Sequence, residues 1–179
     1  NDSTLTGYRQ TNGWARTRTV HFSMTFSKPF KSYGSRNFEK GQVYRGFWRK
    51  FDQTDNFPDL AGRQLRMHFD FDVEAGEQVM VKLALSPVSM SGATANRETE
   101  IPHWDFDKTK AEGQQRWEEE LSRIRVKLPS EKDYVNFYTA MYHATLMPSV
   151  YMDSDGRYRG LDHEIHQAKG FINYTSFSL

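Results

Sequence analysis

Three carboxylates stand close together near the end of the chain, at Asp153, Asp155 and Asp162. Carboxylate oxygens bind Ca2+, and a calcium-hand loop with Asp153 and Asp155 as its third and fifth ligands puts Asp162 at the twelfth position. The first ligand of that loop would be Tyr151, which carries no carboxylate. The spacing therefore favours a plain Asp-Gly turn, in which Gly156 takes a positive φ.

Two histidines follow at an H-x-x-H spacing, His163 and His166, with Glu164 between them. On a helix this spacing would place both imidazoles on one face, as a metal site requires. No third ligand accompanies the pair, so a polar surface turn is the favoured interpretation. Asp70 and Asp72 alternate along an expected strand, where exposure to solvent accounts for them.

Other reaction signatures are absent from the sequence. The chain has 179 residues and no Cys, which excludes a disulfide framework, a thiol nucleophile and a cysteine-based zinc site. It contains no Ser/His/Asp triad order, phosphate loop or dinucleotide fingerprint. No apolar run approaches the roughly 20 residues that span a bilayer, and the opening residues lack a signal-peptide pattern. The residues alone predict an architecture but no reaction.

Basic residues are concentrated in the first fifty positions, which hold ten Lys and Arg against two acidic residues. Such asymmetry is one footprint of nucleic-acid binding. Here the charges alternate with apolar residues and do not cluster, which favours a solvated sheet face on part of a larger protein. We therefore expect no nucleic-acid partner.

The elements that position these residues begin with β-strands. Apolar and polar residues alternate in 19–27, 65–73 and 78–86, which is the period of a half-buried strand. Gly, Pro, Asn and Asp separate the three segments. The pattern predicts antiparallel strands with one wet face, most simply a sandwich. Between 32 and 62 the sequence is mostly loop, with one strand expected near 43–51.

After Pro102 the period becomes helical. Trp117, Leu121, Ile124 and Leu128 fall on one face of a helix predicted over 108–128, whose last residues fray into extended chain. A second helix is predicted from Ser130, which can cap it with Asp133 in capping-box position, to the stop at Pro148. This helix is apolar nearly all round, so we expect it to belong to a larger helical body.

The segment 137–179, "FYTAMYHATLMPSVYMDSDGRYRGLDHEIHQAKGFINYTSFSL", resembles the start of the catalytic domain of the family 92 glycoside hydrolases, which are calcium-dependent exo-acting α-mannosidases. In that family a helix of the form "FYTALYHT" is followed by "P", by "D-x-D-G-x-Y-x-G" and by "NYTTFSLWDTYR". The matching residues are Tyr138, Tyr142, His143, Pro148, Asp153, Asp155, Gly156, Tyr158, Gly160, Asn173, Tyr174, Thr175, Phe177, Ser178 and Leu179. Upstream, 7–15 and 26–30 look like late strands of the family's N-terminal β-sandwich, and the helix around Trp117 looks like its linker.

The resemblance implies a multidomain fragment, β then α. Residues 1–103 would form part of an antiparallel β-sandwich domain, and 104–129 a linker helix. Residues 130–179 would supply the first helices of a truncated (α/α)6 barrel. The intact parent would be secreted, periplasmic or on the cell surface, without a membrane span.

The activity implied is inverting, calcium-dependent hydrolysis of terminal α-linked mannose, with α-1,2 linkages expected, from mannose-containing glycans. Such catalysis needs a carboxylic acid and a carboxylate on opposite sides of the bond. In the family these residues come later in the domain, so none is assigned before Leu179, and no Ca2+ ligand is assigned within the chain. The chain alone is therefore expected to be inactive, with the remainder of the catalytic domain as its partner.

The resemblance also implies residues that support the mannose pocket. Asp155, Arg157 and Tyr158 would shape the loop near it, and Asn173, Tyr174, Phe177 and Ser178 would carry the chain into it. The alternative hypothesis is a stand-alone β-sandwich that binds sugar or a polyanion without catalysis. Trp14, Phe47 and Trp48 would then form its binding platform.

Overall fold

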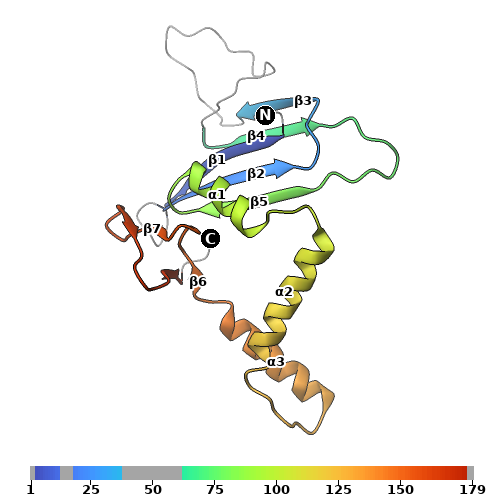
Figure 1. Ribbon diagram of the computed structural model, residues 1–179, viewed down its shortest axis with the longest axis vertical. Coiled ribbons are helices and arrows are strands. Elements are labelled where there is room, and N and C mark those ends of the chain that lie inside the picture. Colours follow the sequence, from blue (N-terminus) through green and yellow to red (C-terminus); the bar gives the residue numbers. More distant parts are fainter. Residues whose placement is uncertain (1–2, 13–17, 38–61, 177–179) are drawn as a thin grey trace. The chain divides into compact units, whose positions relative to one another are not determined.

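The computed structural model describes residues 3–12, 18–37 and 62–176. Along the chain, strands within residues 4–86 come first, helices within 90–145 follow, and short strands within 149–175 come last (Figure 1). The β-then-α organisation predicted from the sequence is confirmed. The chain divides into two compact units, 1–4 with 25–81 and 5–24 with 82–179, and each is described by itself. The strand predicted at 43–51 and the platform residues Trp14, Phe47 and Trp48 lie outside the described residues.

The first unit is a hairpin with an aromatic cluster. Strands β3 (Ser32–Asn37) and β4 (Leu65–Asp70) pair antiparallel, with Ser32 opposite Asp70 and Asn37 opposite Leu65. The ring of Phe26 lies 5.1 Å from Phe69 and 5.2 Å from Phe71, measured between centroids. Such tilted aromatic pairs add to the stabilisation from apolar burial alone.

The second unit contains most of a three-stranded sheet in the order β1 (Thr4–Thr11), β2 (Arg18–Phe26), β5 (Val81–Ser86). The strands predicted at 19–27, 65–73 and 78–86 are thus confirmed as β2, β4 and β5, the last two shorter than expected. Helix α1 (Met90–Glu100) packs on the sheet through small residues. Thr94 Oγ1 donates to Ser23 Oγ at 3.1 Å, and both Ser23 and Ala93 are buried.

On β5 the small residues are buried and the large apolar residues are exposed, which is the reverse of the pattern expected for a half-buried strand. Ala84 and Ser86 are buried, whereas Leu83 and Leu85 are 48% and 40% exposed. The reason is that α1 approaches closely, and only small side chains leave room for a helix backbone at that distance. Among the described residues, the apolar face of β5 is left largely open.

Helix α1 was not predicted from the sequence. Its residues, MSGATANRETE, carry no continuous apolar stripe, so the periodicity gave no signal. Its N-terminus does follow the usual rule, because Ser89 is the N-cap and its hydroxyl accepts from the Gly92 backbone N–H at 2.9 Å.

Helices α2 (Phe106–Leu121) and α3 (Glu131–Thr145) confirm the two predicted helices, but the first ends seven residues early. Ile124 and Leu128 lie outside it, where tyrosines of α3 bind their backbone: Tyr138 donates to the Ile124 carbonyl at 3.2 Å, and Tyr134 accepts from the Leu128 N–H at 3.1 Å. Hydrogen bonds from α3 thus replace the last helical turn that the apolar spacing predicted.

The N-terminus of α3 forms as predicted. Ser130 Oγ accepts from the Asp133 N–H at 3.3 Å and contacts the Asp133 carboxylate at 2.7 Å. Trp117 of α2 packs on Tyr142 of α3 with ring centroids 4.6 Å apart. No helix among the described residues is both long and apolar enough to cross a membrane.

Two small ladders complete the second unit. Strand β6 (Ser149–Val150) pairs with β9 (Tyr174–Thr175), and β7 (Arg157–Arg159) pairs with β8 (Ile165–Gln167), both antiparallel. His163 lies in the turn between β7 and β8 with φ at 69°, and His166 lies in β8. The H-x-x-H pair is therefore not on a helical face, and the surface-turn interpretation is the one that the structure supports.

Candidate functional site

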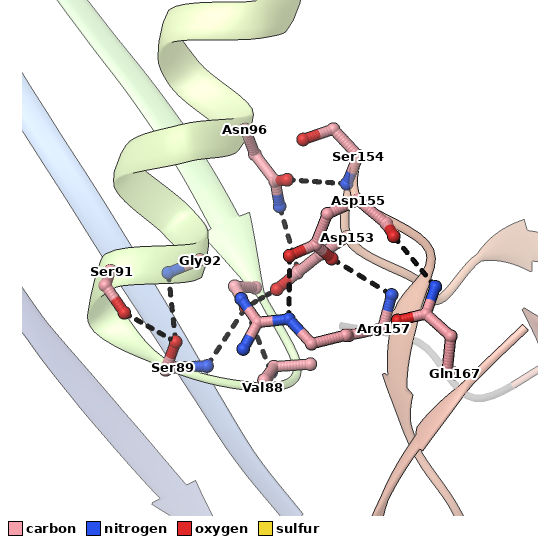
Figure 2. Close-up of polar contacts among 11 residues, drawn as sticks. Val88, Ser89, Ser91, Gly92, Asn96, Asp153, Ser154, Asp155, Arg157 and Gln167 are labelled. Atoms are coloured by element: carbon pink, nitrogen blue, oxygen red, sulfur yellow. Dashed lines mark hydrogen bonds and ion pairs between the residues drawn. The ribbon is translucent and has the colours of Figure 1, made fainter.

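The carboxylate of Asp153 lies buried in the second unit, and the residue is only 2% exposed. Ser86 Oγ donates to its Oδ2 at 2.8 Å. Asn96 Nδ2 donates to its Oδ1 at 2.9 Å (Figure 2). The Asn96 side chain also accepts from the Ser154 N–H at 2.8 Å and donates to the Leu85 carbonyl at 2.9 Å. One cluster thus joins the end of β5, helix α1 and the turn after β6. We call Ser86, Asn96 and Asp153 the Asp153 cluster.

The local sequence builds this cluster by bringing backbones close together. Ser86 Oγ accepts from the N–H groups of Val88 and Ser89 at 2.9 and 3.1 Å, which turns the chain from β5 into α1. At Gly92 a Cβ atom would overlap Asp153 Oδ2 and would lie 2.8 Å from Ser86 Oγ. The helix can approach the carboxylate because Gly92 has no side chain.

Arg159 of β7 ties the β7–β8 ladder to the loop that precedes α1. Its guanidinium donates to the carbonyls of Pro87 at 3.0 Å, Val88 at 3.3 Å and His163 at 2.7 Å. A planar guanidinium with five donors suits such a convergence of carbonyl oxygens. The arginine thereby fixes the start of α1 against the β7–β8 ladder.

The pKa of His21, in β2, is lowered from its usual value. Burial is the main effect that lowers its pKa, and the positive charge of Arg159 lowers it further, while the Ser86 carbonyl and the Asp153 charge oppose the change. Its Nδ1 lies 3.3 Å from the Ser86 carbonyl oxygen. Since a carbonyl can only accept, Nδ1 carries the proton in this contact.

The predicted Asp-Gly turn is confirmed. Gly156 has φ at 84°, and its N–H donates to the Asp153 carbonyl at 2.9 Å, while the Asp153 N–H donates to the Arg157 carbonyl at 2.8 Å. Asp155 accepts from the Arg157 backbone N–H at 3.0 Å and from its Nε at 2.7 Å. These donors, the backbone N–H first, lower the pKa of Asp155. The Gln167 side chain closes the turn by donating to the Asp155 carbonyl at 2.9 Å (Figure 2).

Tyr158 lies between two rings of the same segment. Its centroid is 5.6 Å from His166 and 5.8 Å from Phe171. His166 Nε2 contacts Asp162 Oδ2 at 2.8 Å, and the Glu164 N–H donates to Asp162 Oδ1 at 3.0 Å. Donation from the Glu164 backbone, followed by His166, lowers the pKa of Asp162. The face around Tyr158 therefore presents aromatic and polar groups together.

The β6–β9 ladder places two more of the predicted residues. Asn173 exchanges two hydrogen bonds with Tyr151: its Nδ2 donates to the Tyr151 carbonyl and its own carbonyl accepts from the Tyr151 N–H, each at 2.9 Å. Tyr174 pairs with Val150 and is exposed. Beside this ladder lies a cavity of about 270 Å³. Its lining includes Leu83, Leu85, Asn96, Val150, Tyr151 and Met152.

The predicted pocket-supporting residues thus fall into two groups. Asp155, Arg157 and Tyr158 lie on one turn and strand, and Asn173 and Tyr174 lie on or beside β9. Tyr158 contacts Phe171, two residues before Asn173. Phe177 and Ser178 lie outside the described residues. What each residue does for a ligand stays a prediction.

Sequence reasoning missed the Asp153 cluster. Asp153 was placed in a turn, which is correct, but its partners Asn96 and Ser86 lie 57 and 67 positions away in the chain. No local pattern could have revealed these contacts. The three carboxylates of 153–162 also point to three different partners, and the described residues contain no group of three or more His, Cys, Asp or Glu side chains that could hold a metal. The hydrogen bonds of these three carboxylates can position the backbone. Because each of the three already has a partner, they supply no pair of free carboxyl groups.

Comparison with known proteins extends this picture. A family model described as "Glycosyl hydrolase family 92 N-terminal domain" matches residues 1–86, and one described as "Glycosyl hydrolase family 92 catalytic domain" matches residues 92–179. The first match ends at Ser86 and the second begins at Gly92. The Asp153 cluster therefore joins the last residue of one match to residues of the other.

Solved structures agree with the family models. A family GH92 alpha-mannosidase from Bacteroides thetaiotaomicron is 36% identical, with a TM-score of 0.75, over 97% of this chain and 23% of that chain. The same mannosidase has been solved in complex with mannoimidazole. A family GH92 inverting mannosidase from the same organism, strain VPI-5482, is 23% identical with a TM-score of 0.78, over 97% of this chain and 22% of that chain, and this likeness concerns the fold.

One curated protein also matches. An "uncharacterized secreted glycosidase" of the fungus Arthroderma benhamiae is 28% identical over 89 residues, which cover 48% of this chain and 12% of that protein. The chain spans less than a quarter of the solved structures that it resembles.

Proposed function

We propose, from the premise that this chain belongs to glycosyl hydrolase family 92, that the polypeptide carrying it is an exo-acting α-mannosidase that removes terminal mannose from glycans. One observation carries the proposal most: a mannosidase 36% identical to this chain aligns over 97% of it. The α-1,2 linkage preference and an inverting outcome belong to the same proposal. Inversion requires two carboxyl groups about 6.5–9.5 Å apart, one to protonate the leaving oxygen and one to activate water.

The role proposed for this segment is positioning. The Asp153 cluster joins residues of the two family matches through hydrogen bonds. Solvent does not reach these bonds, because Asp153 and Ser86 are buried. A rigid joint of this kind would hold the start of the catalytic domain in register with the sheet. The proton donor and the general base are expected beyond Leu179, since the chain covers 23% of its mannosidase relative.

Around this joint, we expect the predicted residues to support the mannose pocket. Asp155, Arg157 and Tyr158 would do so from the turn and β7, and Asn173, Tyr174, Phe177 and Ser178 from β9 and the residues that follow. The exposed Tyr174 and the ring contacts of Tyr158 are the observations that favour this assignment. A domain division into 1–103, 104–129 and 130–179, with secretion of the parent, completes the proposal.

Calcium dependence is part of the proposed activity, but the described residues do not fit a calcium site. Asp153, Asp155 and Asp162 each form a hydrogen bond with a group of this chain, at 2.7 to 2.8 Å. Ca2+ takes six to eight oxygen ligands around one point. Its ligands are therefore expected outside the described residues, and no step is assigned to the ion.

Mannose release from α-1,2-linked mannobiose by the intact polypeptide tests the proposal, with and without a calcium chelator. Release that the chelator abolishes and added Ca2+ restores would support both the activity and the metal. Release that the chelator leaves unchanged would support the mannosidase and overturn the calcium requirement. An intact polypeptide that folds but releases no mannose from α-linked substrates would overturn the proposed function.

A further inference from the structure

The second unit also holds a lysine of β5 and an arginine of α1 that directly follows Asn96 of the Asp153 cluster. Lys82 of β5 lies over the ring of Trp104, with Nζ 4.2 Å from the ring centroid, and donates to the Ile101 carbonyl at 2.9 Å. Arg97 of α1 has a side chain that is only 10% exposed. An arginine is rarely this buried unless its charge and its donors are matched by a partner.

Arg97 lacks that partner within the described part of the chain. Its Nη1 is buried and has no hydrogen-bond acceptor there. Its Nη2 lies 3.5 Å from Glu98 Oε1, and the Glu98 side chain is 69% exposed. A contact at that distance to an adjacent, solvated residue is weak. A buried guanidinium is therefore left with unmet donors.

The surroundings make this deficit larger. Burial, and then the positive charge of Arg97, lower the pKa of Lys82. Close by in sequence, Nδ1 of His103 is also buried without a hydrogen-bond partner in the described residues. Lys82 and the buried Arg97 carry like charges, which repel unless an anion lies near both. The deficit is thus of negative charge as well as of acceptors.

We propose that Arg97, supported by Lys82, is a binding site for a carboxylate. A carboxylate supplies one negative charge and two coplanar acceptors, which match the fork of the guanidinium. The carboxylate can come from an Asp or Glu side chain of the polypeptide outside these 179 residues, or from a free acidic ligand such as an acidic sugar. The proposal does not depend on the proposed function.

Replacing Arg97 by methionine tests the site in the intact protein. Methionine has a similar length and removes the charge. If Arg97 is an unpaired buried cation, the substitution should raise the melting temperature. If a carboxylate binds it, the substitution leaves that group unpaired and should lower the melting temperature. Arg116→Met, at an exposed position of α2, is the matched control for loss of one arginine.

The melting temperature is measured in sodium chloride and in sodium acetate at equal ionic strength, for the unsubstituted protein and both variants. A side-chain carboxylate predicts that Arg97→Met melts at least about 2 °C lower than Arg116→Met in both salts. A free carboxylate ligand predicts that acetate raises the melting temperature of the unsubstituted protein and of Arg116→Met, but not of Arg97→Met. Lys82→Met removes the supporting charge. It should therefore lower the melting temperature in chloride if a side-chain carboxylate binds, and should reduce the rise caused by acetate if a free carboxylate binds.

The proposal is overturned if Arg97→Met melts at or above the Arg116→Met control in chloride and acetate has the same effect on both variants. Arg97 would then be an uncompensated buried cation. Arg97→Met could fail to fold while Arg116→Met folds. That result supports a side-chain carboxylate only if Lys82→Met is also destabilised in chloride. A stable Lys82→Met would count against the site.

Discussion

Replacing Asp153 by asparagine changes one oxygen to an amide in the contact between α1 and the turn at 153–157. The native carboxylate accepts from Ser86 Oγ at 2.8 Å and from Asn96 Nδ2 at 2.9 Å, and it is 2% exposed. Asparagine has the same shape but only one acceptor oxygen. Its amide nitrogen must therefore face Ser86 Oγ or Asn96 Nδ2, both of which donate to Asp153 in the native protein.

Neither neighbour can adapt without loss. Ser86 Oγ already accepts from the N–H groups of Val88 and Ser89, so it has little capacity to accept a third donor. The amide of Asn96 is fixed from both ends, by the Ser154 N–H and by the Leu85 carbonyl, and cannot flip. One hydrogen bond is lost and one buried donor is left unpaired, which costs about 1–3 kcal/mol.

Asp153→Ala should cost more, about 3–5 kcal/mol, because it leaves two donors without their acceptor and opens a cavity. Asp155→Asn is the matched control. Asp155 also accepts two hydrogen bonds, from Arg157, but its side chain is 47% exposed, so solvent can replace them and the cost should stay below about 1 kcal/mol.

Urea unfolding of the intact protein, followed by circular dichroism, measures these differences. The expected order of midpoints is unsubstituted protein, Asp155→Asn, Asp153→Asn and Asp153→Ala, with an unchanged m-value. If Asp153→Asn unfolds at the same urea concentration as Asp155→Asn, the buried carboxylate contributes no more than an exposed one. The reasoning that makes the Asp153 cluster a structural joint would then be wrong.

Gly92→Ala should destabilise the protein by at least about 1 kcal/mol in urea unfolding, although alanine is the better helix former by about that amount, because its Cβ would overlap the Asp153 carboxylate. Stabilisation by Gly92→Ala would mean that α1 is free to move away. His21 should titrate by NMR below its usual pKa of about 6.5, so its contribution to stability is full above pH 6.5 and declines as the pH falls toward the folded pKa. A His21 midpoint at or above 6.5 would show that burial does not dominate. Ser130→Ala should cost about 1 kcal/mol and speed hydrogen exchange in the first turn of α3, and unchanged exchange there would argue against the cap.

The elements that the sequence predicted well depend on neighbouring residues. Strand β2 followed from strict alternation, and α3 from a serine cap at one end and a proline stop at the other. The turn at Gly156 followed from Asp-Gly, because a positive φ suits glycine. Each of these signals lies within a few residues of the structure that it specifies, so it can be read without knowing the fold.

The prediction of α2 shows where this reading fails. Ile124 and Leu128 continue the helical spacing of Trp117 and Leu121, yet the helix ends at Leu121. Tyrosine hydroxyl groups of α3 bind the backbone of 124 and 128, and these bonds exist only once α3 has packed beside α2. Spacing indicates which residues can share a face, but tertiary hydrogen bonds decide where a helix stops.

The sequence by itself determined the order of β and α elements, the capped start of α3, the Asp-Gly turn and the family resemblance, since all of these are carried by local or collinear patterns. Only the tertiary structure decided which face of β5 is buried, that α1 exists, and that Asp153 is a buried joint. Burial of a carboxylate is stable only when donors converge on it, and these donors come from positions 57 and 67 residues away. The same reason applies to Arg97, whose burial becomes visible only when α1 is placed on the sheet.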